Sequence, residues 1–242
     1  MTARYLEAVW AVIPARGGSR TIPMKNMVPL NGRPLIDYVI TAARATAAIS
    51  RVVCSTEHDA IAEFCRARDV EVRRRPDALA LDNVPSVDVV LDVLASIQRT
   101  GEPLAEIVVL LEPTSPFVLP AHIEGCVSLL KGDPSADSAQ TITPVGPNSH
   151  AYNQRRLRDG AVEFVCPEER ARYPNKQLKP AFYVHGNVRV VRSRCLLEKR
   201  DLFGGRSLPV VISRLHALDV DGPEDLTMAE CLLQGRAVWL PE

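Results

Sequence analysis

The chain has 242 residues, of which 46% are hydrophobic, and its 29 basic side chains equal its 29 acidic ones. This balance excludes an overall field that would attract nucleic acid or an anionic membrane surface, and no apolar run approaches the roughly 20 residues of a membrane helix. The short apolar stretch near the N-terminus runs directly into a motif, which disfavours a signal peptide. The six cysteines form no CxxC pair and are expected to be free thiols. We therefore expect a cytoplasmic protein that binds neither nucleic acid nor membrane.

Short apolar runs alternate with segments of helical periodicity through the first 145 residues. The runs predict strands at 8–13, 51–56, 70–75, 106–113 and 138–145, and the periodic segments predict helices at 34–45, 58–68, 84–98 and 121–131. The run at 106–113 is the most apolar, which is typical of the centre of a parallel sheet. The alternation predicts a doubly wound, mostly parallel, Rossmann-like α/β sheet, whose ligands bind beyond the carboxyl ends of the strands.

Residues 146–180 interrupt this rhythm with four prolines, many charges and one short predicted strand at 161–166. A long irregular insertion in a compact domain is usually functional or an interface. We interpret it as an arm or β-hairpin that projects from a single domain spanning 1–242, with a disordered surface loop as the alternative. Beyond it, the sequence predicts strands at 181–192 and 209–213 and a helix at 222–235.

The segment PARGGSRTIPMKN (14–26) directly follows the first predicted strand. Its two adjacent glycines allow a tight turn and a close approach of the backbone to a ligand. Three cations lie within ten residues, namely Arg16, Arg20 and Lys25. Backbone amides surrounded by fixed cations suit a polyphosphate. The segment matches neither a Walker A loop nor the Rossmann glycine fingerprint, and a generic basic turn is the alternative reading.

This segment resembles the N-terminal signature IPARGGSKGIPxKN of the acylneuraminate (sialic acid) cytidylyltransferases. Further blocks match that family in the same order: NGRPLIDYVITAA (31–43), VVCSTEHDAIAEF (52–64), RRPDALALDNVPSVDVV (74–90), LLEPTSPFVLPAHI (110–123) and LDVDGPEDLTMAE (218–230). The resemblance implies a fold of the nucleotide-diphospho-sugar transferase type. It also implies an enzyme that lets the anomeric hydroxyl of a 2-keto acid sugar attack the α-phosphate of CTP, which forms a CMP-sugar and pyrophosphate.

The resemblance also implies roles for individual residues on the nucleotide side. The implied nucleotide-binding residues are Ala15, Arg16, Gly17, Gly18, Ser19, Arg20, Lys25, Asn26, Arg75, Ala80 and Asp82. The implied catalytic residues are Arg16, Lys25 and Asp221, with Lys25 offsetting the charge that develops on the phosphates. Arg75 and the backbone around Ala80 and Asp82 would read the cytosine. Thr21 replaces a glycine of the family pattern, and Arg20 replaces a lysine.

Asp219 and Asp221 lie two residues apart at the end of a segment that we predict as a strand. Alternate residues of a strand face the same side, so both carboxylates would reach one cation. Mg²⁺ suits such a pair, because phosphate oxygens and waters complete its octahedron. Solvated or capping aspartates before Gly222 are the alternative.

The implied acceptor-binding residues fall in three segments: Glu112, Thr114 and Ser115; Arg172 and Lys176; and His185 and Gly186. Glu112 stands where the family has glutamine, and His185 and Arg189 replace an asparagine and an aromatic residue. A carboxylate at position 112 would repel a sugar carboxylate unless a cation intervenes. Alternatively, it would bind an amino or hydroxyl group of the acceptor.

The acceptor is therefore expected to be an N-acylneuraminate or related nonulosonic acid, with a Kdo-like or specialised-metabolite acid as the alternative. A sugar-1-phosphate nucleotidyltransferase and a catalytically silent nucleotide-binding module are the wider alternatives. The arm at 146–180 resembles the family's dimerisation insertion, which exchanges between subunits, so a homodimer is also expected.

Overall fold

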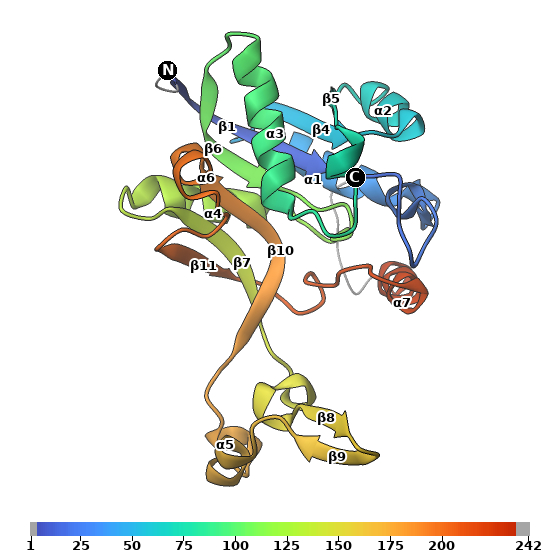
Figure 1. Ribbon diagram of the computed structural model, residues 1–242, viewed down its shortest axis with the longest axis vertical. Helices are drawn as coiled ribbons and strands as arrows, with labels where there is room; N and C mark the ends of the chain where they lie inside the picture. The colour runs from blue at the N-terminus through green and yellow to red at the C-terminus, as the bar shows by residue number, and fades with distance from the viewer. Residues whose placement is uncertain (1–3, 236–242) are drawn as a thin grey trace.

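The computed structural model describes residues 4–235 of the chain. A seven-stranded sheet lies at its centre, in the order β11-β7-β10-β6-β1-β4-β5 (Figure 1). The strands are β1 (Tyr5–Pro14), β4 (Arg51–Thr56), β5 (Glu71–Arg74), β6 (Leu104–Leu110), β7 (Ser138–Pro144), β10 (Tyr183–Arg192) and β11 (Ser207–Val211). Only β10 runs antiparallel to its neighbours among these strands. The predicted mostly parallel sheet is confirmed.

Helices cover both faces of the sheet. Successive side chains of a strand point to opposite faces, and the apolar side chains of β1 are therefore buried on both. Val9, Ala11 and Ile13 belong to one core cluster and Trp10 and Val12 to another. The first cluster includes α1 (Leu35–Arg44), α2 (Asp59–Arg66) and α4 (Pro120–Gly132), and the second includes α3 (Ser86–Arg99) and α6 (Ser193–Lys199). The doubly wound arrangement is therefore also confirmed.

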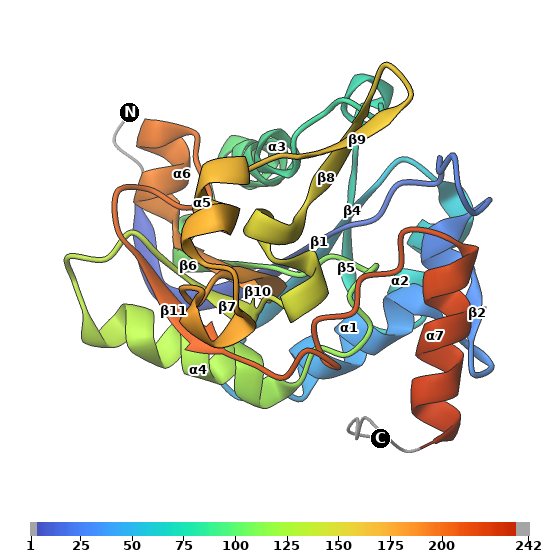
Figure 2. The ribbon, with the colours of Figure 1, turned by 90° about the horizontal axis from the view of Figure 1, so that it is seen from below.

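A third core cluster fixes the last helix, α7 (Pro223–Gln234), beside the small ribbon of β2 (Pro29–Leu30) and β3 (Arg33–Pro34), as Figure 2 shows. Leu30, Tyr38 and Phe117 are buried in it together with Val220 and Ala229. Because Val220 stands between the two aspartates of the predicted metal pair, this packing anchors that segment to the core.

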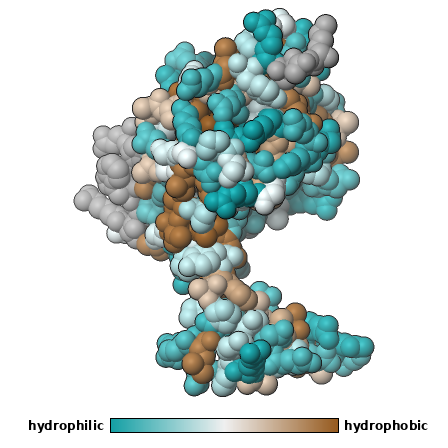
Figure 3. Space-filling model, turned by 90° about the vertical axis from the view of Figure 1, so that its left-hand side faces the viewer, coloured by the Kyte–Doolittle hydropathy of each residue, from teal (hydrophilic) through white to brown (hydrophobic). Residues whose placement is uncertain are grey.

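The insertion forms an arm that leaves the core between β7 and β10 through a narrow neck (Figures 1 and 3). It contains the hairpin of β8 (Arg155–Arg158) and β9 (Ala161–Phe164), the short helix α5 (Pro167–Arg172) and the 3₁₀ turns η3 (Pro147–Ser149), η4 (Ala151–Asn153) and η5 (Lys176–Leu178). His150 stacks on Phe182, and Tyr152 packs against both rings. The structure therefore has the projecting hairpin that we predicted, and the alternative of a disordered loop is wrong.

Three local expectations differ from the structure. The short helix α6 is absent from the prediction, because it buries only Ser193, Cys195 and Leu196 and so carries little periodicity. The last strand, β11, lies two residues earlier than expected. The segment of the two aspartates is a loop and not a strand.

Two of the broader expectations can be compared with the described residues. All six cysteines are free, as predicted. Between residues 4 and 235, no helix has both the length and the apolar character that crossing a bilayer demands.

Candidate active site

A cavity of about 260 Å³ opens beyond the carboxyl ends of β1, β4 and β6. It brings together several of the predicted nucleotide residues, namely Arg16, Gly18, Ser19, Lys25, Asn26, Arg75 and Asp82. It also has an apolar side that sequence reasoning missed, formed by Leu79, Leu81, Val84 and Val89. A cationic loop facing an apolar wall suits a ligand with a charged end and a flat, less polar end.

Gly17 is required by a close approach between the glycine-rich loop and the start of α2. A Cβ at this position would lie 2.5 Å from Cδ2 of His58, which is far inside van der Waals contact. The Gly17 amide donates to Oε1 of Glu57 at 2.6 Å. The binding of phosphate by this amide stays a prediction; in this structure Glu57 accepts from it, while Gly18 and Ser19 line the cavity.

Two cations of the loop share one counter-ion across the cavity. Nη2 of Arg16 lies 2.7 Å from Oδ1 of Asp82, and Arg20 contacts the other oxygen of the same carboxylate. Arg16 also donates to the carbonyl of Ala80 at 3.3 Å, and the amide of Ala80 donates to the carbonyl of Asp77 at 2.9 Å. An anionic ligand in the cavity would compete with Asp82 for both guanidinium groups.

Lys25 lies at the mouth of the cavity and joins the glycine-rich loop to the aspartate segment. Its Nζ donates to the carbonyl of Asp221 at 2.9 Å and lies 3.6 Å from Oδ1 of that residue. The hydroxyl of Thr21 donates to the same carbonyl at 2.5 Å. The threonine that replaces a glycine of the family pattern therefore adds a second hydrogen bond between the two segments. The side chain of buried Asn26 donates to the carbonyl of Arg16 at 2.8 Å and thereby stabilises the glycine-rich loop.

The aspartate segment is a loop that two contacts hold near the end of β6. The amide of Val220 donates to the carbonyl of Thr114 at 2.7 Å, and the hydroxyl of Ser115 donates to Oδ1 of Asp219 at 3.3 Å. Our argument from strand alternation is therefore wrong, although both aspartates still lie beside the cavity and Asp221 lines it.

Asp219 is an exposed residue whose carboxyl group is partly buried by its neighbours. This burial raises its pKa, the negative charges of Asp221 and Glu112 raise it further, and hydrogen bonds from Thr114 and Ser115 oppose the shift. A carboxylate whose pKa is raised by neighbouring negative charges favours a nearby cation. Among the described residues no group of three or more metal-binding side chains occurs, so the pair would supply only part of a coordination shell.

Arg75 lies beneath the cavity in a buried position. Its Nη2 donates to the carbonyl of Ser55 at 2.7 Å and its Nε donates to the hydroxyl of the same residue at 3.2 Å. Burial lowers the pKa of its guanidinium, and the charge of Glu57 counteracts this effect. The role of Arg75 as a reader of cytosine stays a prediction.

Ala15 is buried, and its amide donates to the carbonyl of Ser55, so it supports the loop without lining the cavity.

The predicted acceptor residues are divided between two places. Glu112 and Thr114 line the cavity, and Gly186 is packed so closely that a Cβ would lie 2.5 Å from Oγ1 of Thr141. Arg172 and Lys176 lie on the arm and do not line the cavity of their own chain. The role of these two cations in acceptor binding stays a prediction.

Sequence reasoning missed the partner of Glu112. Nη1 of Arg189 donates to Oε2 of Glu112 at 2.5 Å, although 77 residues separate them in the chain. His185, on the same strand as Arg189, has a buried Nδ1 with no hydrogen-bond partner among the described residues. One signal in the sequence could have predicted this pair: Glu112 and Arg189 place opposite charges at two positions where the family has uncharged residues.

The sequence matches the cytidylyltransferase family over residues 10–239. It is 28% identical to the CMP-N,N'-diacetyllegionaminic acid synthase of Legionella pneumophila, over 93% of this chain and 96% of that protein. It is 27% identical to the N-acylneuraminate cytidylyltransferase of Escherichia coli O18:K1:H7 and 32% identical to N-acylneuraminate cytidylyltransferase A of Danio rerio, over 93% and 91% of this chain. The match covers 52% and 49% of those two proteins, so the chain spans about half their length.

Solved structures with the same fold are more distant in sequence. CMP:2-keto-3-deoxy-manno-octonic acid synthetase, solved in complex with CTP, superposes with a TM-score of 0.71 at 17% identity, over 95% of this chain and 99% of that one. The 4-diphosphocytidyl-2C-methyl-D-erythritol synthase of Anaerococcus prevotii gives a TM-score of 0.65 at 15% identity, over 94% and 96% of the two chains. With a sequence match over nearly its whole length, and with this fold and cavity, the chain belongs to the cytidylyltransferase family and is a nucleotidyltransferase.

Proposed function

We propose that the protein forms a CMP-sugar from CTP and a 2-keto acid sugar and releases pyrophosphate. The observation that carries this proposal is the contact between Lys25 and Asp221 at the mouth of a cavity that the glycine-rich loop also lines. It places a fixed cation and a carboxylate side by side where phosphate would enter. The named activities of the relatives support the same reaction class.

The residues of the cavity suggest how the chain performs this reaction. Arg16, Ser19 and Lys25 would hold the triphosphate and offset the charge that develops on it, the usual source of rate enhancement in such transfers. The cytosine would lie towards Arg75 and the apolar wall. The acceptor would enter from the side of Glu112, and its anomeric oxygen would bond to the α-phosphorus as the bond to the bridging oxygen of pyrophosphate breaks.

We also propose that Asp219 and Asp221 bind Mg²⁺. Their number and mutual repulsion fit a hard cation that takes one or two carboxylates and keeps its other positions for phosphate oxygens and waters. When bound, the ion would offset negative charge on the phosphates. Ser115 would keep Asp219 oriented towards it.

We further propose that the protein is a cytoplasmic homodimer that uses a nonulosonic acid as its acceptor. The exposed apolar side chains of the arm support dimerisation, because Leu157, Val162 and Leu178 are 83%, 63% and 59% exposed. In a dimer, Arg172 and Lys176 would be available to the partner's acceptor. The legionaminic and N-acylneuraminate relatives support the acceptor class.

The reaction is tested by measuring pyrophosphate release from CTP, ATP, GTP or UTP with Mg²⁺. Each triphosphate is combined with N-acetylneuraminate, N,N'-diacetyllegionaminic acid or 2-keto-3-deoxy-manno-octonic acid. We expect release only with CTP and at least one of the acids. Binding of CTP without release in any combination would instead favour a silent nucleotide-binding module, and light scattering of the same sample would reveal a monomer if the dimer proposal is wrong.

A further inference from the structure

A second cavity, of about 290 Å³, lies next to the nucleotide cavity and shares Ser86 and Glu112 with it. Its remaining lining residues are Pro85, Val87, Arg189, Asp201, Leu202 and Phe203. These come from the start of α3, from β10 and from the turn after α6, so the cavity lies on the far side of Glu112 from the glycine-rich loop. Ser86 and Glu112 therefore form the boundary that the two cavities share.

Arg189 is the one cation among the residues that line this second cavity. His185 does not add a positive charge near neutral pH, because burial and the charge of Arg189 lower its pKa to about 4, with Glu112 opposing. Asp201 already accepts hydrogen bonds from the amides of Phe203 and Gly204. Within its own chain, Arg189 is therefore the cation that an anion in this cavity would contact.

The pairing of Arg189 leaves half of its guanidinium without a protein partner. Nη1 bonds Glu112 at 2.5 Å, whereas the described contacts give Nη2 no hydrogen bond and leave the buried Nε unpartnered. Because Nε is closed off from solvent, Nη2 is the nitrogen that remains for a ligand, and it can donate a charge-assisted hydrogen bond to a carboxylate oxygen. Glu112 is fixed in turn by the hydroxyl of Ser86 at 3.2 Å, so it holds the guanidinium in place as a counter-ion.

We propose that Arg189 is the residue that binds the carboxylate of the acceptor sugar, with Glu112 as its positioning counter-ion. The proposal rests on the proposed function, because it assigns the acceptor side of that same reaction. It explains how a site with a carboxylate at position 112 accepts an acid: Arg189 neutralises Glu112 through Nη1, and its Nη2 donates to the carboxylate of the acceptor. Arg189 is thereby a specificity-determining residue that favours acids over neutral sugars.

The test is a set of steady-state measurements on the full-length protein with CTP, Mg²⁺ and the best acid of the panel. Arg189→Met should raise the KM for the acid about tenfold or more and leave the KM for CTP unchanged, because removal of one partner leaves the carboxylates unpaired. Glu112→Gln should change the KM for the acid about threefold or less, since the guanidinium remains. The double variant Glu112→Gln/Arg189→Met should bind the acid better than Arg189→Met alone.

Controls separate recognition from folding. Arg194→Met removes an exposed cation of α6 whose recorded bond is to the carbonyl of Pro134, and it should leave both KM values unchanged. Arg189→Lys keeps the charge without the planar fork and should restore part of the lost affinity for the acid.

An unchanged KM for the acid in Arg189→Met would overturn the inference while the proposed function stands. A KM for CTP that rises equally would show that Arg189 serves the nucleotide, which also overturns it. If the wild-type protein releases no pyrophosphate with CTP and any acid of the panel, the proposed function fails and the inference fails with it.

Discussion

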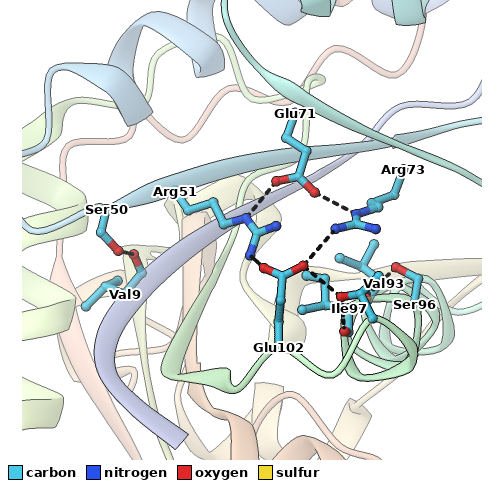
Figure 4. A network of polar contacts seen from close by, with 10 residues as sticks. Val9, Ser50, Arg51, Glu71, Arg73, Val93, Ser96, Ile97 and Glu102 are labelled. Atoms are coloured by element: carbon cyan, nitrogen blue, oxygen red, sulfur yellow. Dashed lines mark hydrogen bonds and ion pairs between the residues drawn. The ribbon is translucent and has the colours of Figure 1, made fainter.

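The two ends of the sheet carry the same kinds of charged residues in opposite arrangements. At the amino ends of β4 and β5, Arg51 and Arg73 each contact both Glu71 and Glu102, and all four side chains neutralise one another (Figure 4). At the carboxyl ends, the cations surround an open cavity and Asp82 alone serves two arginines.

The difference separates structural from functional charges. In the amino-end network every guanidinium has a nearby carboxylate, and Arg51 also lies over the ring of Trp10, so little capacity remains for a ligand. At the carboxyl end, Arg16 and Arg20 share the single carboxylate of Asp82, and Gly18 and Ser19 line the cavity beside them. Cations that share a single carboxylate beside a cavity therefore indicate the ligand-binding site better than the number of charged residues does.

Removal of Lys25 should have the largest effect on turnover. We expect Lys25→Met to lower kcat about 100- to 1000-fold, because the cation would offset charge that develops on the phosphates. The unfolding free energy should change little, since Met keeps the length of the stem. Steady-state pyrophosphate release and urea unfolding measure the two quantities; an unchanged kcat would remove Lys25 from the catalytic set.

Gly17→Ala should weaken CTP binding because it changes the shape of the glycine-rich loop. The added Cβ would meet His58 at 2.5 Å, and overpacking of this kind costs about 1–3 kcal/mol. We expect about tenfold weaker CTP binding by calorimetry, about 1.4 kcal/mol. The double variant Gly17→Ala/His58→Ala should recover most of the affinity. If it does not, the ring of His58 is not what excludes a side chain here.

Glu71→Gln tests the other side of the comparison. It leaves Arg51 and Arg73 with one carboxylate between them and should lower the unfolding free energy by about 1 kcal/mol. The affinity for CTP and the value of kcat should stay as in the wild type. A loss of turnover in a folded Glu71→Gln variant would mean that the amino-end network is coupled to the site.

Asp82→Asn should have the smallest effect and the opposite sign. Because Asp82 competes with phosphate for Arg16 and Arg20, its neutralisation should tighten CTP binding about threefold, which calorimetry resolves. Asp77→Asn, in the preceding 3₁₀ turn η2 (Asp77–Leu79), is the matched control and should leave the affinity unchanged. Weaker binding in Asp82→Asn would instead indicate that Asp82 contacts the nucleotide.

The sequence was informative where a pattern is local. The buried strands, the long helices and the glycine-rich loop follow from periodicity and adjacent residues, and so does the arm as an interruption of that rhythm. The prediction of a strand for the two aspartates was wrong. Contacts to Thr114 and Ser115 hold this segment as a loop, and such contacts between residues far apart in the chain leave no local pattern in the sequence. The pairing of Arg189 with Glu112 depends on β10 lying beside β6, a topological fact that composition cannot supply.

The most direct test of the account is an experimental structure determined with CTP and Mg²⁺. We predict the triphosphate against Gly18, Ser19 and Lys25, with the cytosine on the wall formed by Leu79 and Leu81. Nucleotide bound elsewhere on the chain, or in this cavity with the base against Lys25 and the phosphates against the apolar wall, would contradict it.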